Sequence, residues 1–155
     1  MDNTLENRRV IAVVPAYNER DNIVSTIEDL QSNAPGVDYV IVNDGSKDDT
    51  LSICREHGYN VIDLPVNLGL AGAFQTGMRY AYGHGYDYAI QFDADGQHRP
   101  EFIEPMLNRI KEGYDIVIGS RFINQKKEKS LRMIGSKMLT VAIKITTGKR
   151  VADPT

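Results

Sequence analysis

Five short apolar runs recur along the chain, and segments with a helical pattern separate them. The runs cover residues 9–15, 39–42, 60–64, 88–92 and 115–118. A continuous apolar run of this length is typical of a strand buried on both faces, as in a parallel sheet. The segments between them are residues 21–32, the stretch with Leu51 and Cys54, residues 71–82, and 100–111 after a helix-starting proline. This order predicts an α/β fold with a doubly wound, mostly parallel sheet.

Polar clusters follow four of the five predicted strands. In chain order they are Tyr17-Asn18-Glu19, Asn43-Asp44-Gly45-Ser46, Asp93-Ala94-Asp95 and Gly119-Ser120-Arg121. Ligands of open α/β sheets bind outside the carboxyl ends of the strands, where these clusters are expected to lie. Their placement predicts a ligand site at that edge.

Asp93-Ala94-Asp95 carries the clearest chemistry of these clusters. Two carboxylates one residue apart at a strand end suit a hard cation such as Mg²⁺ or Mn²⁺. Magnesium usually bridges one or two carboxylates to substrate phosphates, and Gln97 offers a further neutral oxygen. The plainer alternative is an acidic turn that begins a helix.

The polar clusters after the first and second predicted strands favour binding of a nucleoside. Pro15 cannot donate to a strand ladder and marks a strand end, after which Tyr17 offers a ring for stacking and Glu19 a hydrogen-bond acceptor. Asp44 offers an acceptor to a base N–H or a ribose hydroxyl. The alternative for both clusters is a turn with a helix cap, since Asn, Asp, Gly and Ser are common in such places.

Other motifs are less informative. Asn67-Leu68-Gly69 and Gly72 precede a predicted helix but match neither a P-loop nor a dinucleotide-binding fingerprint, so these glycines serve either ligand approach or helix packing. His57 and His84 are expected on the surface. His98 lies near the Asp93 turn, with no evident nucleophile or metal-ligand spacing.

Charge is distributed unevenly. Residues 121–155 hold nine Lys and Arg against two acids, a net charge of +7, whereas residues 1–120 sum to −10. Such a basic segment indicates an anionic partner, either nucleic acid or membrane, or a solvated surface. Residues 131–147 predict a helix that is apolar around most of its circumference, and such a helix is buried, dimerised or laid on a membrane. The single cysteine excludes an intrachain disulfide, and no apolar run is long enough for a membrane span.

Taken together and in order, these motifs resemble family 2 glycosyltransferases of GT-A fold. The resemblance rests on residues 14–19, 42–46 with Asp49-Thr50, 67–69, 93–98 with Pro100-Glu101, and 119–121. It is strongest to dolichyl-phosphate mannosyltransferases and bacterial polyprenyl-phosphate glycosyltransferases.

The resemblance implies a role for each matching position. Pro15, Tyr17, Glu19 and Asp44 would hold the nucleoside, and Asp93 and Ala94 would lie along the ribose and diphosphate. Asp93, Asp95 and Gln97 would bind Mg²⁺ or Mn²⁺, and Arg121 would contact phosphate. Arg132 and Ser136 resemble an element near an acceptor phosphate. The remaining residues expected to line the donor site are Ala16, Asn18, Val42 and Gly45.

Two departures from the family pattern stand out. The usual pair of aspartates after the second strand is here Asn43-Asp44, and the chain stops at Thr155, where the family continues. We therefore expect a C-terminally truncated transferase, with a donor-binding core in residues 1–120 and an incomplete acceptor side in residues 121–155.

The predicted activity is inverting transfer of a hexose from a GDP- or UDP-sugar to a polyprenyl or dolichyl phosphate. Asp93, Asp95 and Arg121 are the predicted catalytic residues. The predicted location is the cytoplasmic face of a membrane, without nucleic acid as a partner and with a homodimer as one option. The alternatives are transfer to a sugar hydroxyl, a nucleotide-sugar binding module without activity, a nucleotidyltransferase and a phosphatase. The last two are disfavoured because residues 15–19 lack a Gly-rich basic loop and Gln97 replaces the hydroxyl residue of a DxDG phosphatase.

Overall fold

A computed structural model describes residues 8–119 of the chain. Its strands are β1 (Val10–Ala16), β2 (Asp38–Asn43), β3 (Val61–Asp63) and β4 (Tyr88–Gln91). Its helices are α1 (Ile23–Asn33), α2 (Thr50–Glu56), α3 (Gly69–Gly83) and α4 (Ile103–Lys111), the last preceded by a 3₁₀ turn, η1 (Pro100–Phe102). The first four predicted strands and all four predicted helices within this range are thereby confirmed, with ends shifted by one to three residues.

All four strands are parallel, in the order β3-β2-β1-β4. The chain moves outward from β1 through β2 to β3 and then returns to place β4 on the opposite side of β1. The strand order therefore reverses between β1 and β4, and such a switch point is where ligands bind in this class of sheet. The structure confirms the predicted α/β fold with a doubly wound parallel sheet.

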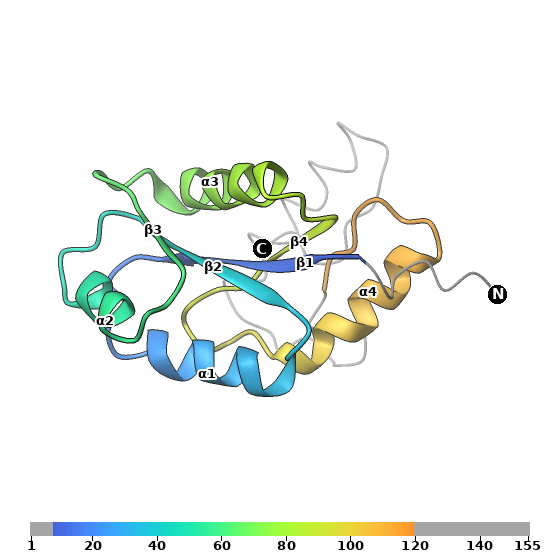
Figure 1. Ribbon diagram of the computed structural model, residues 1–155, viewed down its shortest axis with the longest axis horizontal. Helices are drawn as coiled ribbons and strands as arrows, with labels where there is room; N and C mark the ends of the chain where they lie inside the picture. The colour runs from blue at the N-terminus through green and yellow to red at the C-terminus, as the bar shows by residue number, and fades with distance from the viewer. Residues whose placement is uncertain (1–7, 120–155) are drawn as a thin grey trace, which may run out of the picture. The chain divides into compact units, whose positions relative to one another are not determined.

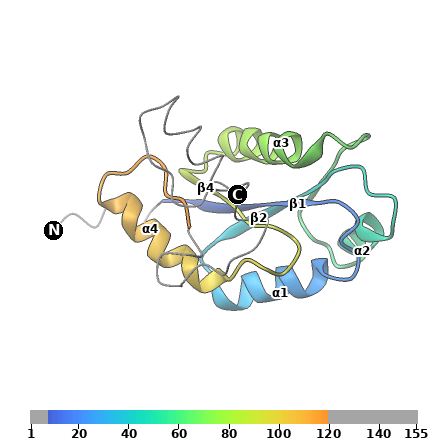
Figure 2. The ribbon, with the colours of Figure 1, turned by 180° about the vertical axis from the view of Figure 1, so that it is seen from behind.

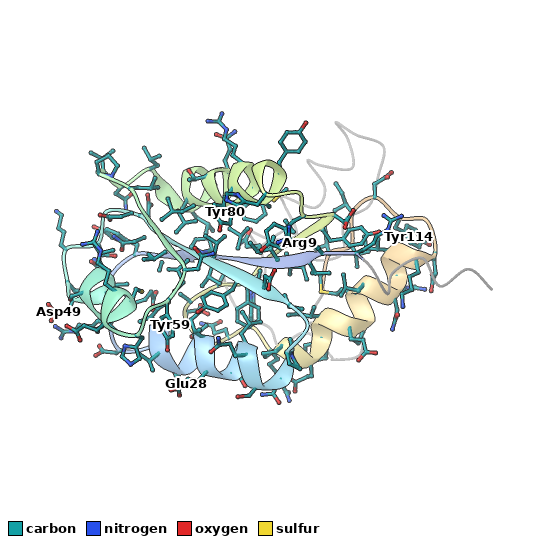
Figure 3. All side chains as sticks on the ribbon, viewed as in Figure 1. Arg9, Glu28, Asp49, Tyr59, Tyr80 and Tyr114 are labelled. Carbon is teal, nitrogen blue, oxygen red and sulfur yellow. The ribbon has the colours of Figure 1, made fainter. Side chains whose placement is uncertain are left out.

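Helices cover both faces of the sheet (Figures 1 and 2): α3 lies on one face, and α1, α2 and α4 lie on the other. Alternate residues of β1 supply the two cores, because successive side chains of a strand point to opposite faces. Ala12, Val14 and Ala16 pack toward α1, whereas Ile11 and Val13 pack toward α3. Figure 3 shows one aromatic side chain on each side, Tyr59 with the α1 layer and Tyr80 with α3.

Helix α1 follows from its apolar spacing. Ile23, Ile27 and Leu30 are fully buried, as the sequence predicts, and each contributes roughly 1.5–3 kcal/mol by leaving water. In α2 the fully buried residues are Thr50 and Cys54, whereas Leu51, which the sequence predicts to face inward, is only half-buried. Within residues 8–119, no helix combines the length and the apolar character needed to cross a bilayer.

The fifth predicted strand is wrong. Residues 115–118 have no strand conformation, and the side chains of Ile116 and Ile118 are 77% and 71% exposed. An apolar run becomes a strand only when a neighbouring strand satisfies its backbone groups, and no described strand pairs with this one. Residues 8–112 form one compact unit, and 113–119 lie outside it. The predicted helix over 131–147 lies outside the described residues.

Candidate functional site

Residues 92–97 follow β4 and form a turn, which we call the Asp93 turn. The switch point between β1 and β4 separates this turn from the β1–α1 loop. The main chain of the turn is anchored at Phe92, whose N–H donates to the Val13 carbonyl at 2.9 Å, and at Ala94, whose carbonyl accepts from Thr26 Oγ1 at 3.2 Å. Ala94 is buried, whereas Asp93 is half-buried and Asp95 exposed. Gly96 completes the turn with a φ of +72°, which a residue with a Cβ adopts only under strain. The anchored turn therefore leaves the Asp95 carboxylate exposed and the Asp93 carboxylate partly accessible.

Each carboxylate of this turn has one oxygen held by a local donor. Asp93 Oδ1 accepts from Gln91 Nε2 at 2.9 Å, and Asp95 Oδ1 accepts from the Gln97 N–H at 2.9 Å. Among residues 8–119, no group of three or more Asp, Glu, His or Cys side chains is arranged to hold a metal ion. Two carboxylates with the exposed Gln97 amide fit a cation such as Mg²⁺, which completes its shell with water and phosphate oxygens.

His98 folds back onto Asp93. Its Nδ1 accepts a hydrogen bond from the Asp93 N–H at 2.8 Å, its Nε2 lies 3.5 Å from Asp93 Oδ2, and its ring packs edge-on against Phe92. The sequence places His98 near this turn but gives no spacing rule that would predict the contact. It depends on the turn conformation that Gly96 permits.

Asp44 joins the end of β2 to the β3–α3 loop. Its side chain is 97% buried, and Oδ1 accepts from the Leu68 N–H at 2.7 Å. Beside it, a Cβ at Gly45 would lie 2.8 Å from backbone atoms of Val66 and Asn67, so the two loops meet backbone to backbone there. Asp44 thus bridges two loops through its bond to Leu68, the residue directly before α3.

The replacement of an aspartate by Asn43 has a physical reason in this chain. Asn43 is 1% exposed, and its Nδ2 donates to Asp63 Oδ1 on β3 at 2.8 Å. A carboxylate at the buried position 43 would face the carboxylate of the exposed Asp63, and the two like charges would repel. The neutral amide turns that conflict into a hydrogen bond between β2 and β3.

The β1–α1 loop exposes Tyr17, whose side chain is 41% exposed, directly after β1. Glu19 begins the turn into α1: its carbonyl accepts from the Ile23 N–H at 2.9 Å and its Oε2 from Asn22 Nδ2 at 2.9 Å. Asn18 does not cap α1, because its Oδ1 instead accepts from the Lys47 N–H at 2.8 Å. Because the Tyr17 side chain is exposed, its ring can contact a ligand.

Comparison with known proteins agrees with this geometry. The family model described as glycosyl transferase family 2 matches residues 11–153. The chain belongs to glycosyl transferase family 2.

Two curated relatives of this family 2 chain have informative names. One is the polyprenol monophosphomannose synthase of Mycolicibacterium smegmatis, 30% identical over 75% of this chain and 46% of that protein. The other is the UDP-N-acetylglucosamine–dolichyl-phosphate N-acetylglucosaminyltransferase of Methanococcus voltae, 32% identical over 96% of this chain and 67% of that protein. The chain spans about half the length of the first curated relatives that it matches.

A solved relative is the mannosyltransferase PcManGT from Pyrobaculum calidifontis, in complex with GDP-Man and Mn²⁺. It is 25% identical with a TM-score of 0.52, and the match covers 58% of this chain and 28% of that one. The predicted membership of family 2 and the GT-A fold are thereby confirmed.

The structure brings most predicted site residues of this family 2 chain to one edge of the sheet. Tyr17, Asn18 and Glu19 follow β1, Asp44 and Gly45 follow β2, and the turn with Asp93, Asp95 and Gln97 follows β4. Pro15, Ala16 and Val42 lie inside the sheet with buried side chains, so any contact with a ligand is left to their main-chain atoms. Arg121, Arg132 and Ser136 lie outside the described residues.

Pro15 lies inside β1 without weakening the sheet. The Ala16 carbonyl accepts from Asp44 N on the β2 side, and the Val13 carbonyl accepts from Phe92 N on the β4 side. Since successive residues of a parallel strand bond to alternate neighbours, Pro15 faces the β4 side, where pairing has ended at Gln91. Its missing N–H therefore costs the sheet no hydrogen bond.

Proposed function

We propose that this chain is the donor-binding part of an inverting glycosyltransferase that uses a nucleoside-diphosphate sugar. The observation that carries the proposal is the pair Asp93 and Asp95, presented at the switch point between β1 and β4. The nucleoside residues Tyr17 and Asp44 follow β1 and β2 on the other side of that point. The GDP-Man and Mn²⁺ bound to the Pyrobaculum enzyme support the same pairing of nucleotide sugar and cation.

The nucleoside is recognised at the ends of β1 and β2. The exposed ring of Tyr17 stacks on the base. Asp44 uses only Oδ1 to hold Leu68, so Oδ2 is left to accept from a base N–H or a ribose hydroxyl. Because Asp44 is buried, such a charge-assisted bond is stronger than it would be at the surface.

The diphosphate lies along the Asp93 turn. Asp93, Asp95 and Gln97 hold a divalent cation, which supplies positive charge against the diphosphate as it leaves. The bonds from Gln91 and Gln97 orient the two carboxylates before any ligand arrives, so little reorganisation is needed on binding. We assign Arg121 a second contact to phosphate, following its place in the family motif.

We propose a polyprenyl or dolichyl phosphate as the acceptor, supported by the names of the Mycolicibacterium and Methanococcus relatives. A phosphate oxygen is already anionic, and its attack on the anomeric carbon from the face opposite the diphosphate inverts that centre. No strong general base is needed for this nucleophile, whereas a sugar hydroxyl would require one. An acceptor of this kind implies work at a membrane surface, and we propose that the basic residues of 121–155 bind it.

A transfer assay tests the proposal. The chain is incubated with radiolabelled GDP-mannose or UDP-N-acetylglucosamine, Mn²⁺ and a short-chain polyprenyl phosphate, and the label that enters the organic phase is counted. Lipid-linked label that disappears with EDTA and with Asp95→Asn supports it. Donor binding without any lipid product would leave a nucleotide-sugar binding module, and label on added sugars instead would indicate a hydroxyl acceptor.

A further inference from the structure

Three successive backbone N–H groups of the β1–α1 loop donate to side chains of the β2–α2 loop and of Thr50, the first residue of α2. Asn18 N donates to Ser46 Oγ at 3.0 Å. Glu19 N donates to Thr50 Oγ1 at 2.8 Å. Arg20 N donates to Asp48 Oδ2 at 3.3 Å. We call these three bonds, together with their acceptors Ser46, Asp48 and Thr50, the loop brace.

The loop brace is reinforced in both directions. The Lys47 N–H donates back to Asn18 Oδ1 at 2.8 Å, so Asn18 both gives and receives a bond across the two loops. Asn18 has a φ of +58°, the one positive φ of a non-glycine residue in the part of the chain that the structure describes. This conformation costs an L-residue of order 1–3 kcal/mol, and it persists where surrounding contacts fix it.

The acceptors are themselves held in place. The Thr50 hydroxyl accepts from Glu19 and donates to Asp48 Oδ1 at 2.5 Å, and the Thr50 N–H donates to the same oxygen at 3.0 Å. Burial opposes the charge on Asp48, but bonds from Thr50 and Arg20 outweigh it and hold the pKa of this carboxyl below its ordinary value. Thr50 is fully buried, so its hydroxyl has no water to replace a lost partner.

The donors of the loop brace are backbone N–H groups, so the brace fixes the main chain of residues 18–20 and not their side chains. Tyr17 comes directly before the three braced N–H groups, and Glu19 is one of the braced residues. Asp44 comes two residues before Ser46, at the start of the other loop. The Asp44 N–H donates to the Ala16 carbonyl at 2.8 Å and ties the two strand ends together, and the brace fixes the course of the two loops beyond that bond.

We propose that Ser46, Asp48 and Thr50 are positioning residues for the nucleoside: they hold the Tyr17 loop at its binding distance from Asp44 without touching the ligand. The inference rests on the proposed function and deepens it by naming what sets the geometry of the nucleoside site. The Asp93 turn leaves a different strand and takes no part in the brace, so binding of metal and pyrophosphate does not depend on it.

The test compares Thr50→Val with Thr50→Ser in the full chain. Valine keeps the shape and loses the hydroxyl, whereas serine keeps the hydroxyl and loses only a methyl group. Isothermal titration with GDP, UDP and pyrophosphate, each with excess Mn²⁺, gives the affinities, and thermal unfolding reports the fold. We expect Thr50→Val to weaken the preferred nucleoside diphosphate about tenfold, the usual result of a lost hydrogen bond, and Thr50→Ser to restore most of it. Pyrophosphate affinity should stay within about twofold for both.

Ser46→Ala provides a second variant, since Ser46 is only half-buried and its loss threatens the fold less than a change at Thr50. It should weaken nucleoside diphosphate binding in the same selective way. Unchanged nucleoside affinity in folded Ser46→Ala and Thr50→Val, or an equal loss for pyrophosphate, overturns the positioning role while leaving the proposed function intact. Failure of the unaltered chain to bind GDP or UDP overturns the proposed function and this inference with it.

Discussion

His98 Nδ1 accepts a hydrogen bond from the backbone N–H of Asp93 across 2.8 Å. A backbone N–H can only donate, so Nδ1 carries no proton and the neutral ring has its proton on Nε2. That Nε2 lies 3.5 Å from Oδ2 of the same aspartate. One imidazole therefore meets both the main chain and the carboxylate of Asp93, and its ring orientation fixes the orientation of a proposed metal ligand.

We predict that His98→Ala weakens Mn²⁺-dependent binding of a nucleoside diphosphate about tenfold, because the freed Asp93 turn must be ordered on binding. His57→Ala is the matched control, since His57 also uses Nδ1 in a local contact, to the Ile53 carbonyl at 2.9 Å, but lies far from the Asp93 turn in the sequence. Equal titration curves for the two variants would deny His98 any part in the site.

Asp44→Asn separates the two roles of the Asp44 carboxylate, which are to hold the β3–α3 loop and, as we propose, to bind the nucleoside. The amide oxygen still accepts from the Leu68 N–H and keeps the β3–α3 loop in place, but the other position becomes an N–H₂ donor that repels a base N–H. Affinity for the nucleoside diphosphate should fall roughly tenfold to a hundredfold, the range for a lost bond to a charged group. Titration with pyrophosphate and Mn²⁺ serves as the control and should be nearly unchanged. A parallel fall in both would mean that Asp44 does not act on the nucleoside.

Asn43→Asp should destabilise the fold by roughly 1–3 kcal/mol, because it buries a charge at position 43 beside the Asp63 carboxylate, which Arg55 partly offsets from 3.5 Å. Burial raises the pKa of the new carboxyl in the folded state, so the penalty should shrink as the pH falls and should vanish below the ordinary aspartate pKa of about 3.9, where the carboxyl is protonated in both states. Adding Asp63→Asn restores one donor and one charge to the pair, and should recover most of the lost stability. Urea unfolding of the unaltered chain, of Asn43→Asp and of the double variant measures this. A mild Asn43→Asp phenotype at neutral pH would show that the cavity around position 43 admits water.

The basic segment 121–155 should hold the chain on anionic vesicles at low salt. Each Lys or Arg near such a surface contributes about 1 kcal/mol, and the attraction weakens as salt shortens the Debye length. Co-sedimentation with phosphatidylserine vesicles, compared with phosphatidylcholine vesicles and with a chain that ends at Asn124, measures the effect. Equal recovery of both chains in the supernatant would leave the segment without a membrane role.

Features that depend on nearby residues could be predicted from the sequence. Buried runs give strands, and clusters such as Asp93-Ala94-Asp95 mark their ends, so the sheet and the edge that carries the site were predictable. Features that depend on a partner far away in the sequence could not be predicted. The acceptor of the Asn18 N–H is 28 residues away on another loop, and the contact of His98 with Asp93 needs a particular turn conformation. The run at 115–118 has strand composition, but nothing in its own residues says whether a neighbouring strand is available.

The central claim is that Asp93 and Asp95 bind a nucleoside diphosphate through a divalent cation. Isothermal titration of the chain with GDP and UDP, in Mn²⁺ and then in EDTA, tests it most directly. Asp95→Asn is the test variant, and Glu28→Gln, an exposed carboxylate on α1 (Figure 3), is the matched control. The account predicts binding that EDTA and Asp95→Asn abolish and Glu28→Gln leaves intact, with unchanged thermal unfolding. Equal affinity with and without EDTA would contradict it.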